Sequence, residues 1–325
     1  MKLPRRKFLH LAAGAAALPA VSRSASALDY PTRPVHWIVG FAPGGGYDIV
    51  ARLMARRLSE RLGQSFVIEN RPGAGTNVAT EAVVNAHPDG YTLLLAGTSA
   101  AINATLYDKL NFNFIRDIAP VAGLARGPFV MLVNPAFSAK TVPAFIAYAK
   151  ANPGKVNMGS GGTGSGSHLA GELFKMMADV HLVHVPYRGN GPAITALLAG
   201  QVEVLFPTSA SSMAYIRAGT LRALAVTSAM RLEELPDVPT VGEFVSGYET
   251  SGWYGVGAPK ATAAEIIDKI NEEVTAGLAD PNTKARFADL GDVPMPMSPA
   301  EFGKLIVDET EKWAKVIKFA NIKPE

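Results

Sequence analysis

Cysteine is absent from all 325 residues of the chain. Its absence excludes disulfides, thiolate metal sites, cysteine nucleophiles and a lipid anchor attached through cysteine. Long hydrophobic runs are missing too. The longest apolar stretch, Leu11 to Val21, is short and rich in alanine, so we do not expect it to cross the roughly 30 Å core of a membrane.

Clusters of positive charge are also missing once the N-terminal segment is set aside. The first 27 residues carry five of the 31 basic residues and none of the 28 acidic ones, so the remainder has a formal charge of −2 rather than +3. No dense run of lysine and arginine remains there. The sequence therefore lacks the electrostatic footprint of a protein that binds nucleic acid or a membrane surface.

The N-terminal segment has the pattern of an export signal. Arg5 and Arg6 form a twin-arginine region, Leu11 to Val21 is the apolar region, and Ala25-Ser26-Ala27 matches an A-x-A cleavage site. An anchor helix is the alternative that the short apolar run disfavours. We expect residues 1–27 to be a removed signal peptide and the mature chain to be a soluble periplasmic protein, exported by the twin-arginine or Sec route.

Short apolar runs alternate with helical periodicity along the rest of the chain. Because strands covered by helices on both faces are apolar throughout, this alternation predicts an α/β fold with mainly parallel sheets. The expected strands are Val35–Val39, Phe66–Ile68, Thr92–Ala96, Phe129–Val133, Val156–Met158, Leu182–Val185, Val202–Phe206 and Leu221–Val226.

Two breaks in the pattern suggest where the chain changes domain. One lies around Ala122–Pro128, and the other, rich in proline and glycine, around Leu235–Tyr248. A chain that enters a second domain at the first break and returns at the second gives a discontinuous domain 1 (28–124 and 240–325) and an inserted domain 2 (125–239). Two crossing strands would then form the hinge.

Three strand-to-helix junctions carry glycines, and the first is the most informative. After the apolar run Val35–Val39, the turn Gly44-Gly45-Gly46 precedes Asp48 and an amphipathic helix. A bare turn and a helix N-terminus aim unpaired N–H groups and a positive dipole end at one spot, which suits an anion. The other junctions are Glu69–Asn77 and Met158–Leu169, where Thr163, Ser165 and Ser167 add hydroxyls.

Partial matches to catalytic and cofactor-binding motifs occur, but they lack the neighbouring residues that those motifs require. Gly159, Gly161 and Gly164 match G-x-G-x-x-G, but the strand that follows ends without an acid to hold a ribose. Gly97–Ala101 imitates a nucleophile elbow without its closing glycine. No Walker A or metal-ligand spacing is present, including around His168, His181 and His184. We therefore predict no catalytic residue, metal or cofactor, with an exported α/β enzyme as the less favoured alternative.

The chain resembles the Bug (TctC-type) solute receptors of tripartite tricarboxylate transporters. Three signatures carry the resemblance: Phe41–Asp48 with Ala51-Arg52, Glu69–Gly75, and His184–Gly189. Further matching blocks are Gly200-Gln201-Val202, Leu221–Ser228, Pro236–Thr240, Trp253 and Ala258-Pro259. The likeness covers essentially the whole chain after the signal segment.

The resemblance implies a monomeric periplasmic binding protein, type II-like, with two α/β domains that close over a small carboxylate and present it to membrane transport subunits. Main-chain amides of the glycine turns would hold the acid. Carried over position by position, the implied ligand-binding residues are Phe41, Gly45, Gly46, Tyr47, Asp48, Asn77, Thr98, Ser99, Ser165, Gly166, Ser167, Tyr187 and Thr208.

Departures from the family pattern leave the ligand open. Pro207-Thr208-Ser209 stands where an acid is common, Thr76-Asn77 replaces a further glycine, and Thr195 stands where aspartate is frequent. The acid can be a di- or tricarboxylate, an amino acid or an aromatic carboxylate. A receptor that docks on a signalling protein instead of a transporter is a further alternative.

Overall fold

The computed structural model describes residues 29–319, 322 and 323, so the expected signal peptide lies outside the described residues. The chain divides into a short N-terminal unit, 1–30, and a large unit, 31–325, and all that follows concerns the large unit. Within the described part of the chain, no helix combines the length and apolarity needed to cross a membrane.

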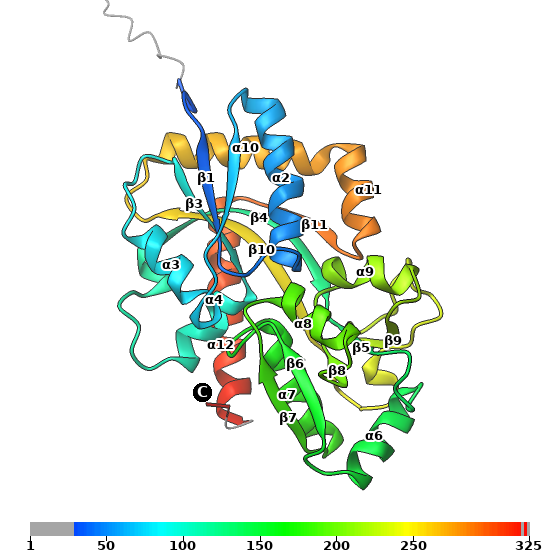
Figure 1. Cartoon of the computed structure of the whole chain (residues 1–325). Helices are drawn as coiled ribbons and strands as arrows, with labels where there is room; N and C mark the ends of the chain where they lie inside the picture. The colour runs from blue at the N-terminus through cyan, green and yellow to red at the C-terminus, as the bar shows by residue number, and fades with distance from the viewer. Residues whose placement is uncertain (1–28, 320–321, 324–325) are drawn as a thin grey trace, which may run out of the picture. The chain divides into compact units, whose positions relative to one another are not determined.

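The first sheet has six strands in the order β11-β4-β10-β3-β1-β2 (Figure 1). Its strand β1 pairs in parallel with β2 and β3 on either side, with Val35 opposite Phe66 and His36 opposite Thr92. The strands are β1 (Val35–Val39), β2 (Phe66–Asn70), β3 (Thr92–Gly97), β4 (Ile118–Pro128), β10 (Ser251–Pro259) and β11 (Val293–Met297).

Helices cover both faces of this sheet, which explains why β1 is apolar throughout. Trp37 and Ile38 point to opposite faces, yet they are 0% and 1% exposed. The helical elements are α2 (Gly46–Leu62), η1 (Ala74–Thr76), α3 (Asn77–Val84), α4 (Thr98–Leu106), α5 (Phe114–Asp117), α10 (Ala264–Ala279), α11 (Pro281–Asp289) and α12 (Pro299–Phe319). We call this sheet and its helices the first lobe.

The second sheet has five strands in the order β7-β6-β8-β5-β9, and with its helices it forms the second lobe. Phe145, Phe174 and Phe206 pack in its core. Its strands are β5 (Val130–Val133), β6 (Val156–Ser160), β7 (Leu182–Pro186), β8 (Val204–Leu205) and β9 (Arg222–Val226). Its helices are α6 (Val142–Ala151), α7 (Gly166–Ala178), α8 (Asn190–Leu198), α9 (Ser209–Arg217) and η2 (Val241–Glu243).

The α/β fold class is confirmed, but the expectation of mainly parallel sheets is wrong. Among the strands of the described residues, β1–β2, β1–β3, β6–β7 and β6–β8 are the pairs that run in parallel. Strand β10 is antiparallel to both β3 and β4, and β5 is antiparallel to both β8 and β9. The reason is the route of the chain: β4 leaves the first sheet and β10 returns to it alongside, so the two strands run in opposite directions.

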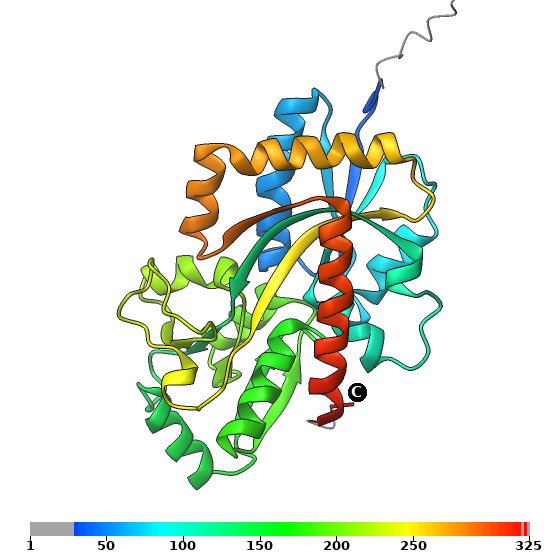
Figure 2. The ribbon, with the colours of Figure 1, turned by 180° about the vertical axis from the view of Figure 1, so that it is seen from behind.

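The supposed break at Ala122–Pro128 is therefore part of strand β4, which continues almost directly into β5. Figure 2 shows β4 and β10 leaving the first sheet beside α12. Where they pass from one lobe to the other, buried Thr227 ties them together. Its hydroxyl accepts from Phe129 N (2.8 Å) and donates to the Thr250 carbonyl (2.7 Å). The two crossing segments are thus held as one unit.

Candidate ligand-binding site

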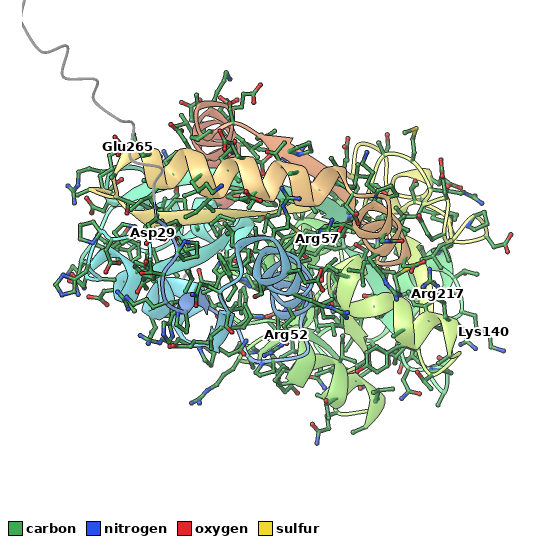
Figure 3. The ribbon with its side chains drawn as sticks, turned by 90° about the horizontal axis from the view of Figure 1, so that it is seen from above. Asp29, Arg52, Arg57, Lys140, Arg217 and Glu265 are labelled. Carbon is green, nitrogen blue, oxygen red and sulfur yellow. The ribbon has the colours of Figure 1, made fainter. Side chains whose placement is uncertain are left out.

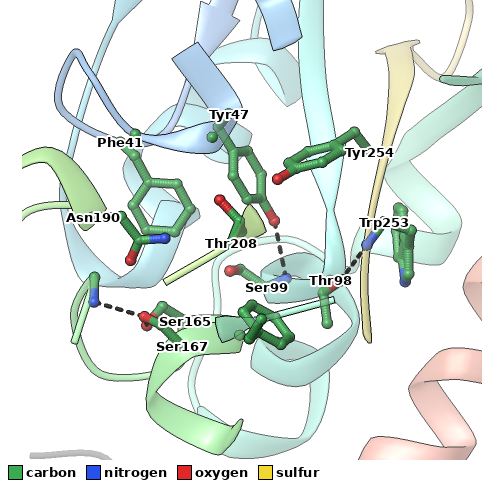
Figure 4. Close-up of a pocket in the computed structure, with 16 residues that line it drawn as sticks. Phe41, Tyr47, Thr98, Ser99, Ser165, Ser167, Asn190, Thr208, Trp253 and Tyr254 are labelled. Atoms are coloured by element: carbon green, nitrogen blue, oxygen red, sulfur yellow. Dashed lines mark hydrogen bonds between the residues drawn. The ribbon is translucent and has the colours of Figure 1, made fainter. Parts of the chain in front are cut away.

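A cavity lies where the two lobes face each other, and five helices begin at its wall (Figure 4). Helices α2 and α4 come from the first lobe, and α7, α8 and α9 from the second. The lining residues are Phe41, Gly45, Gly46, Tyr47, Thr98, Ser99, Phe129, Gly161, Ser165, Gly166, Ser167, Asn190, Thr208, Gly252, Trp253 and Tyr254. None of them carries a charged side chain.

The glycine turn before α2 is fixed from outside the cavity by Asp48. This carboxylate is 4% exposed and accepts from Gly44 N (3.0 Å), Arg52 Nε (3.0 Å) and Asn70 Nδ2 (3.0 Å). Burial alone would raise the pKa of Asp48, but the donors Arg52, Gly44 and Asn70 together outweigh it and lower that pKa. Figure 3 marks Arg52 on α2. Asp48 is therefore ionised, and in this form it orders the turn.

The opposite wall is the glycine–serine loop before α7, and its own side chains fix its shape. Ser167 Oγ accepts from Gly161 N (2.8 Å), and Ser165 Oγ accepts from His168 N (3.2 Å) as the cap of α7. His168 Nδ1 accepts from Gly164 N (3.4 Å). Burial, with the nearby charges of His184 and Lys175, lowers the pKa of His168 to about 2, so its ring stays neutral and able to accept.

Aromatic rings line one side of the cavity. Tyr47 packs edge-on against Phe41 and Tyr254, with ring centroids 4.7 Å and 5.1 Å apart. Burial raises the pKa of Tyr47 to about 12 and that of Tyr254 well above its ordinary value. Both phenols therefore remain neutral and can donate a hydrogen bond.

One hydroxyl in the cavity lacks a partner. Ser99 is 1% exposed, and its Oγ makes no hydrogen bond within the described residues, while its main-chain N donates to Tyr47 Oη (3.4 Å). Buried hydroxyls are normally paired because an unmade hydrogen bond costs about 1–3 kcal/mol. Ser99 thus offers an unused hydrogen bond to a guest.

The lobes approach most closely at the first glycine turn. A Cβ on Gly46 would lie 2.2 Å from Thr208 Oγ1, and one on Gly45 would lie 3.4 Å from Asn190 N. Across the same contact, a Cβ on Gly191 would lie 2.4 Å from the Pro43 carbonyl. Glycine at Gly46 and Gly191 is therefore what allows the two lobes to come this near.

The cavity itself is small, with a volume of about 20 Å³. One water needs roughly 10–15 Å³ by this measure, so the space holds one or two waters. A second cavity of about 230 Å³ adjoins it and shares Phe41 and Gly161 with it. A whole organic acid needs the lobes to part, or must extend into this second space.

The structure brings ten of the thirteen predicted binding residues to the cavity wall. The other three lie elsewhere. Asp48 bonds to the turn from behind, Asn77 Oδ1 accepts from Asn103 Nδ2 (3.2 Å), and Tyr187 lines the second cavity. Direct contact of any of the thirteen with a ligand stays a prediction.

Sequence reasoning did not assign six lining residues. Asn190 follows Arg188-Gly189, a fourth glycine turn before a helix, and that signal was available in the sequence. Trp253 and Tyr254 belong to a glycine-rich strand without clear alternation, so nothing local pointed to them. The six are Phe129, Gly161, Asn190, Gly252, Trp253 and Tyr254.

Replacing Asp48 tests its role behind the turn. In Asp48→Asn one oxygen becomes an NH₂ group that faces the donors of Arg52 and Asn70, so we expect a loss of about 2 kcal/mol in the free energy of unfolding. Because the native pKa is lowered, this contribution is present above about pH 4 and fades as the carboxylate protonates below it. Urea unfolding at pH 7 and pH 3.5 measures it. An equal effect at both values would contradict the role.

Two lobes of α/β structure around a cavity built from helix N-termini define the architecture of a periplasmic binding protein. Solved structures with this fold include the periplasmic binding protein BugD, which is 32% identical, with a TM-score of 0.88 over 91% of this chain and 100% of that one. The model of the tripartite tricarboxylate transporter family receptor matches residues 50–322. The chain belongs to this family, as the sequence motifs predicted.

Individual relatives are similar along at least nine tenths of their length. The protein BugT of Bordetella pertussis is 37% identical over 92% of this chain and 92% of its own. An R. palustris protein solved with adipate is 36% identical, with a TM-score of 0.89, and the match covers 91% of this chain and all of that one. MatC of Rhodopseudomonas palustris, solved with malate, is 32% identical, with a TM-score of 0.84 over 89% and 100%.

Proposed function

We propose that this chain is a periplasmic receptor that captures a small organic carboxylate and delivers it to the membrane subunits of a tripartite tricarboxylate transporter. Main-chain N–H groups at the cavity wall hold the acid, and no bond is made or broken. The observation that carries the proposal is the convergence of five helix N-termini on one cavity whose lining residues have no charged side chain.

The physical argument rests on the ends of helices. The first amides of a helix have no acceptor within it, and the aligned peptide dipoles place a partial positive charge there. A carboxylate accepts hydrogen bonds from these amides and also carries the opposite charge, whereas a cation or a neutral sugar does not do both. Hydrogen bonds to a charged group contribute about 1.5–3 kcal/mol each, so a few of them support micromolar affinity, about −8 kcal/mol.

We further propose that the lobes are separate domains, 28–124 with 240–325 and 125–239, and that they open about the two crossing segments joined by Thr227. The small volume of the cavity supports this, since a whole acid does not fit in this cavity alone while the lobes stay this close. A ligand that touches both walls stabilises the closed arrangement over the open one.

The experiment is a thermal-shift screen of the chain without residues 1–27. Adipate, malate, aspartate and benzoate are the acids, and glucose and AMP are the controls. A ligand at 100 times its Kd stabilises the folded protein by about 2.7 kcal/mol, which raises the Tm by roughly 5 °C in a protein of this size. Stabilisation by an acid and not by the controls is the expected result. A response to AMP or glucose alone would overturn the proposal.

A further inference from the structure

The second cavity contains one charged residue, Arg188, and no described group pairs with it. Its guanidinium has no hydrogen bond or ion pair within the part of the chain that the structure describes, and the residue is exposed. The other residues that line this cavity carry no charge. An arginine whose side chain has no pairing partner among the described residues thus lines a space that adjoins the ligand cavity.

This second cavity is built by both lobes. Gly73–Gly75 and Tyr107 come from the first lobe, and Gly161–Thr163 with Tyr187-Arg188 come from the second. Tyr107 Oη donates to the Thr163 carbonyl across it (3.4 Å). A group bound here therefore touches both walls, as a group in the first cavity does.

The main chain holds Arg188 in place independently of its side chain. Its carbonyl accepts from Ala42 N (2.8 Å), and Gly189 after it has φ +142° with a Cβ position only 3.1 Å from that same nitrogen. The segment is thus fastened to the strand end that leads into the first glycine turn. A change of the Arg188 side chain leaves these contacts intact.

From this geometry we infer that Arg188 is a specificity residue for a second acid group. It rests on the proposed function: one carboxylate occupies the uncharged cavity between the helix N-termini, and the carbon chain extends past Phe41 and Gly161. The second carboxylate then lies beside Arg188. The chain would therefore prefer dicarboxylates to monocarboxylates of the same length.

The charges of the two cavities support this division. The first cavity has helix ends but no cationic side chain, so it compensates one acid group. Among the residues that line the two cavities, Arg188 is the only cationic side chain that a second carboxylate could meet. The guanidinium fork of arginine matches a carboxylate in both charge and shape.

The test compares adipate with hexanoate, which has the same six carbons and one acid group. Isothermal titration measures both acids with the wild-type protein, Arg188→Gln and Arg188→Lys. We expect Arg188→Gln to weaken adipate binding about tenfold and to leave hexanoate binding unchanged, with Arg188→Lys in between. Arg217→Gln is the matched control, since this arginine is exposed at the end of α9 (Figure 3) and should change neither affinity.

The salt dependence of binding provides a second readout, which would not change if Arg188 had only a structural role. Raising the salt from 0.05 M to 0.5 M should reduce the wild-type preference for adipate, because the Arg188 site is exposed and screened, and should not change that of Arg188→Gln. Equal losses for both acids, or none for adipate, would overturn the inference while leaving the proposed function intact. A wild-type protein that binds neither acid, nor any in the thermal screen, would overturn both.

Discussion

Gly46→Asp should abolish acid binding, with an affinity loss of about 100-fold or more. A Cβ at Gly46 would lie 2.2 Å from Thr208 Oγ1 and 2.6 Å from Tyr254 Oη, so no larger residue fits while the lobes are closed. The added carboxylate also repels the ligand at the N-terminus of α2. Isothermal titration with the best acid from the thermal screen measures the loss.

The fold should survive this change. The clash with Thr208 is with the opposite lobe, so it is relieved when the lobes part. The contact with Tyr254 lies within the first lobe and remains. Gly46→Ala separates the two causes: it blocks closure without adding charge and should lose less affinity than Gly46→Asp. Gly277→Ala on α10 is the matched control, because its Cβ meets only two flexible side chains, the stem of Arg57 at 3.3 Å and Met54 Cε at 3.5 Å. Full affinity in Gly46→Asp would place the ligand elsewhere.

Asp292→Asn should remove a large part of the pH dependence of stability. Asp292 lies between α11 and β11 and is 2% exposed; it accepts from Ser209 Oγ of the second lobe (2.7 Å), and its Oδ2 has no partner among the described residues. Burial raises its pKa to about 7. The unfolded carboxyl ionises near pH 3.9, so between about pH 4 and pH 7 the folded protein holds a proton that the unfolded chain has released.

Stability therefore falls as pH rises through this window, and the loss is complete above pH 7. The gap between the two pKa values corresponds to about 4 kcal/mol at most. Asn at this position cannot ionise, so Asp292→Asn should lose less stability than the wild type between pH 5 and pH 8. Urea unfolding at both values measures the difference. Asp268→Asn on the exposed side of α10 is the control, and equal pH slopes in wild type and Asp292→Asn would contradict the account.

The sequence indicated which glycine turns lie at the cavity wall better than it indicated the sheet topology. Glycines before helices leave a local signal, and Gly45, Gly46 and Ser165–Ser167 line the cavity as the junctions suggested. Of the strands expected from apolar runs, Val35–Val39 was found with its predicted bounds, while Val202–Phe206 shortened to Val204–Leu205.

Strands β4, β10 and β11 were not predicted because their residue types are set by contacts with distant elements. They therefore show no local pattern of apolar and polar residues. In β10, a Cβ on Gly255 would lie 2.1 Å from the ring of Phe302, so glycine there admits a side chain of α12. Such a contact joins residues far apart in sequence, and no pattern within the strand reveals it. For the same reason, no local pattern predicted that Tyr254 would lie at the cavity wall.

The most direct test of main-chain capture is a crystal structure of the chain without residues 1–27 bound to adipate, or to the acid that stabilises it most. The account predicts one carboxylate within hydrogen-bonding distance of amides at the starts of both α2 and α7, in contact with Ser99 Oγ. An acid bound outside this cavity, or held there by charged side chains instead of main-chain N–H groups, would contradict it.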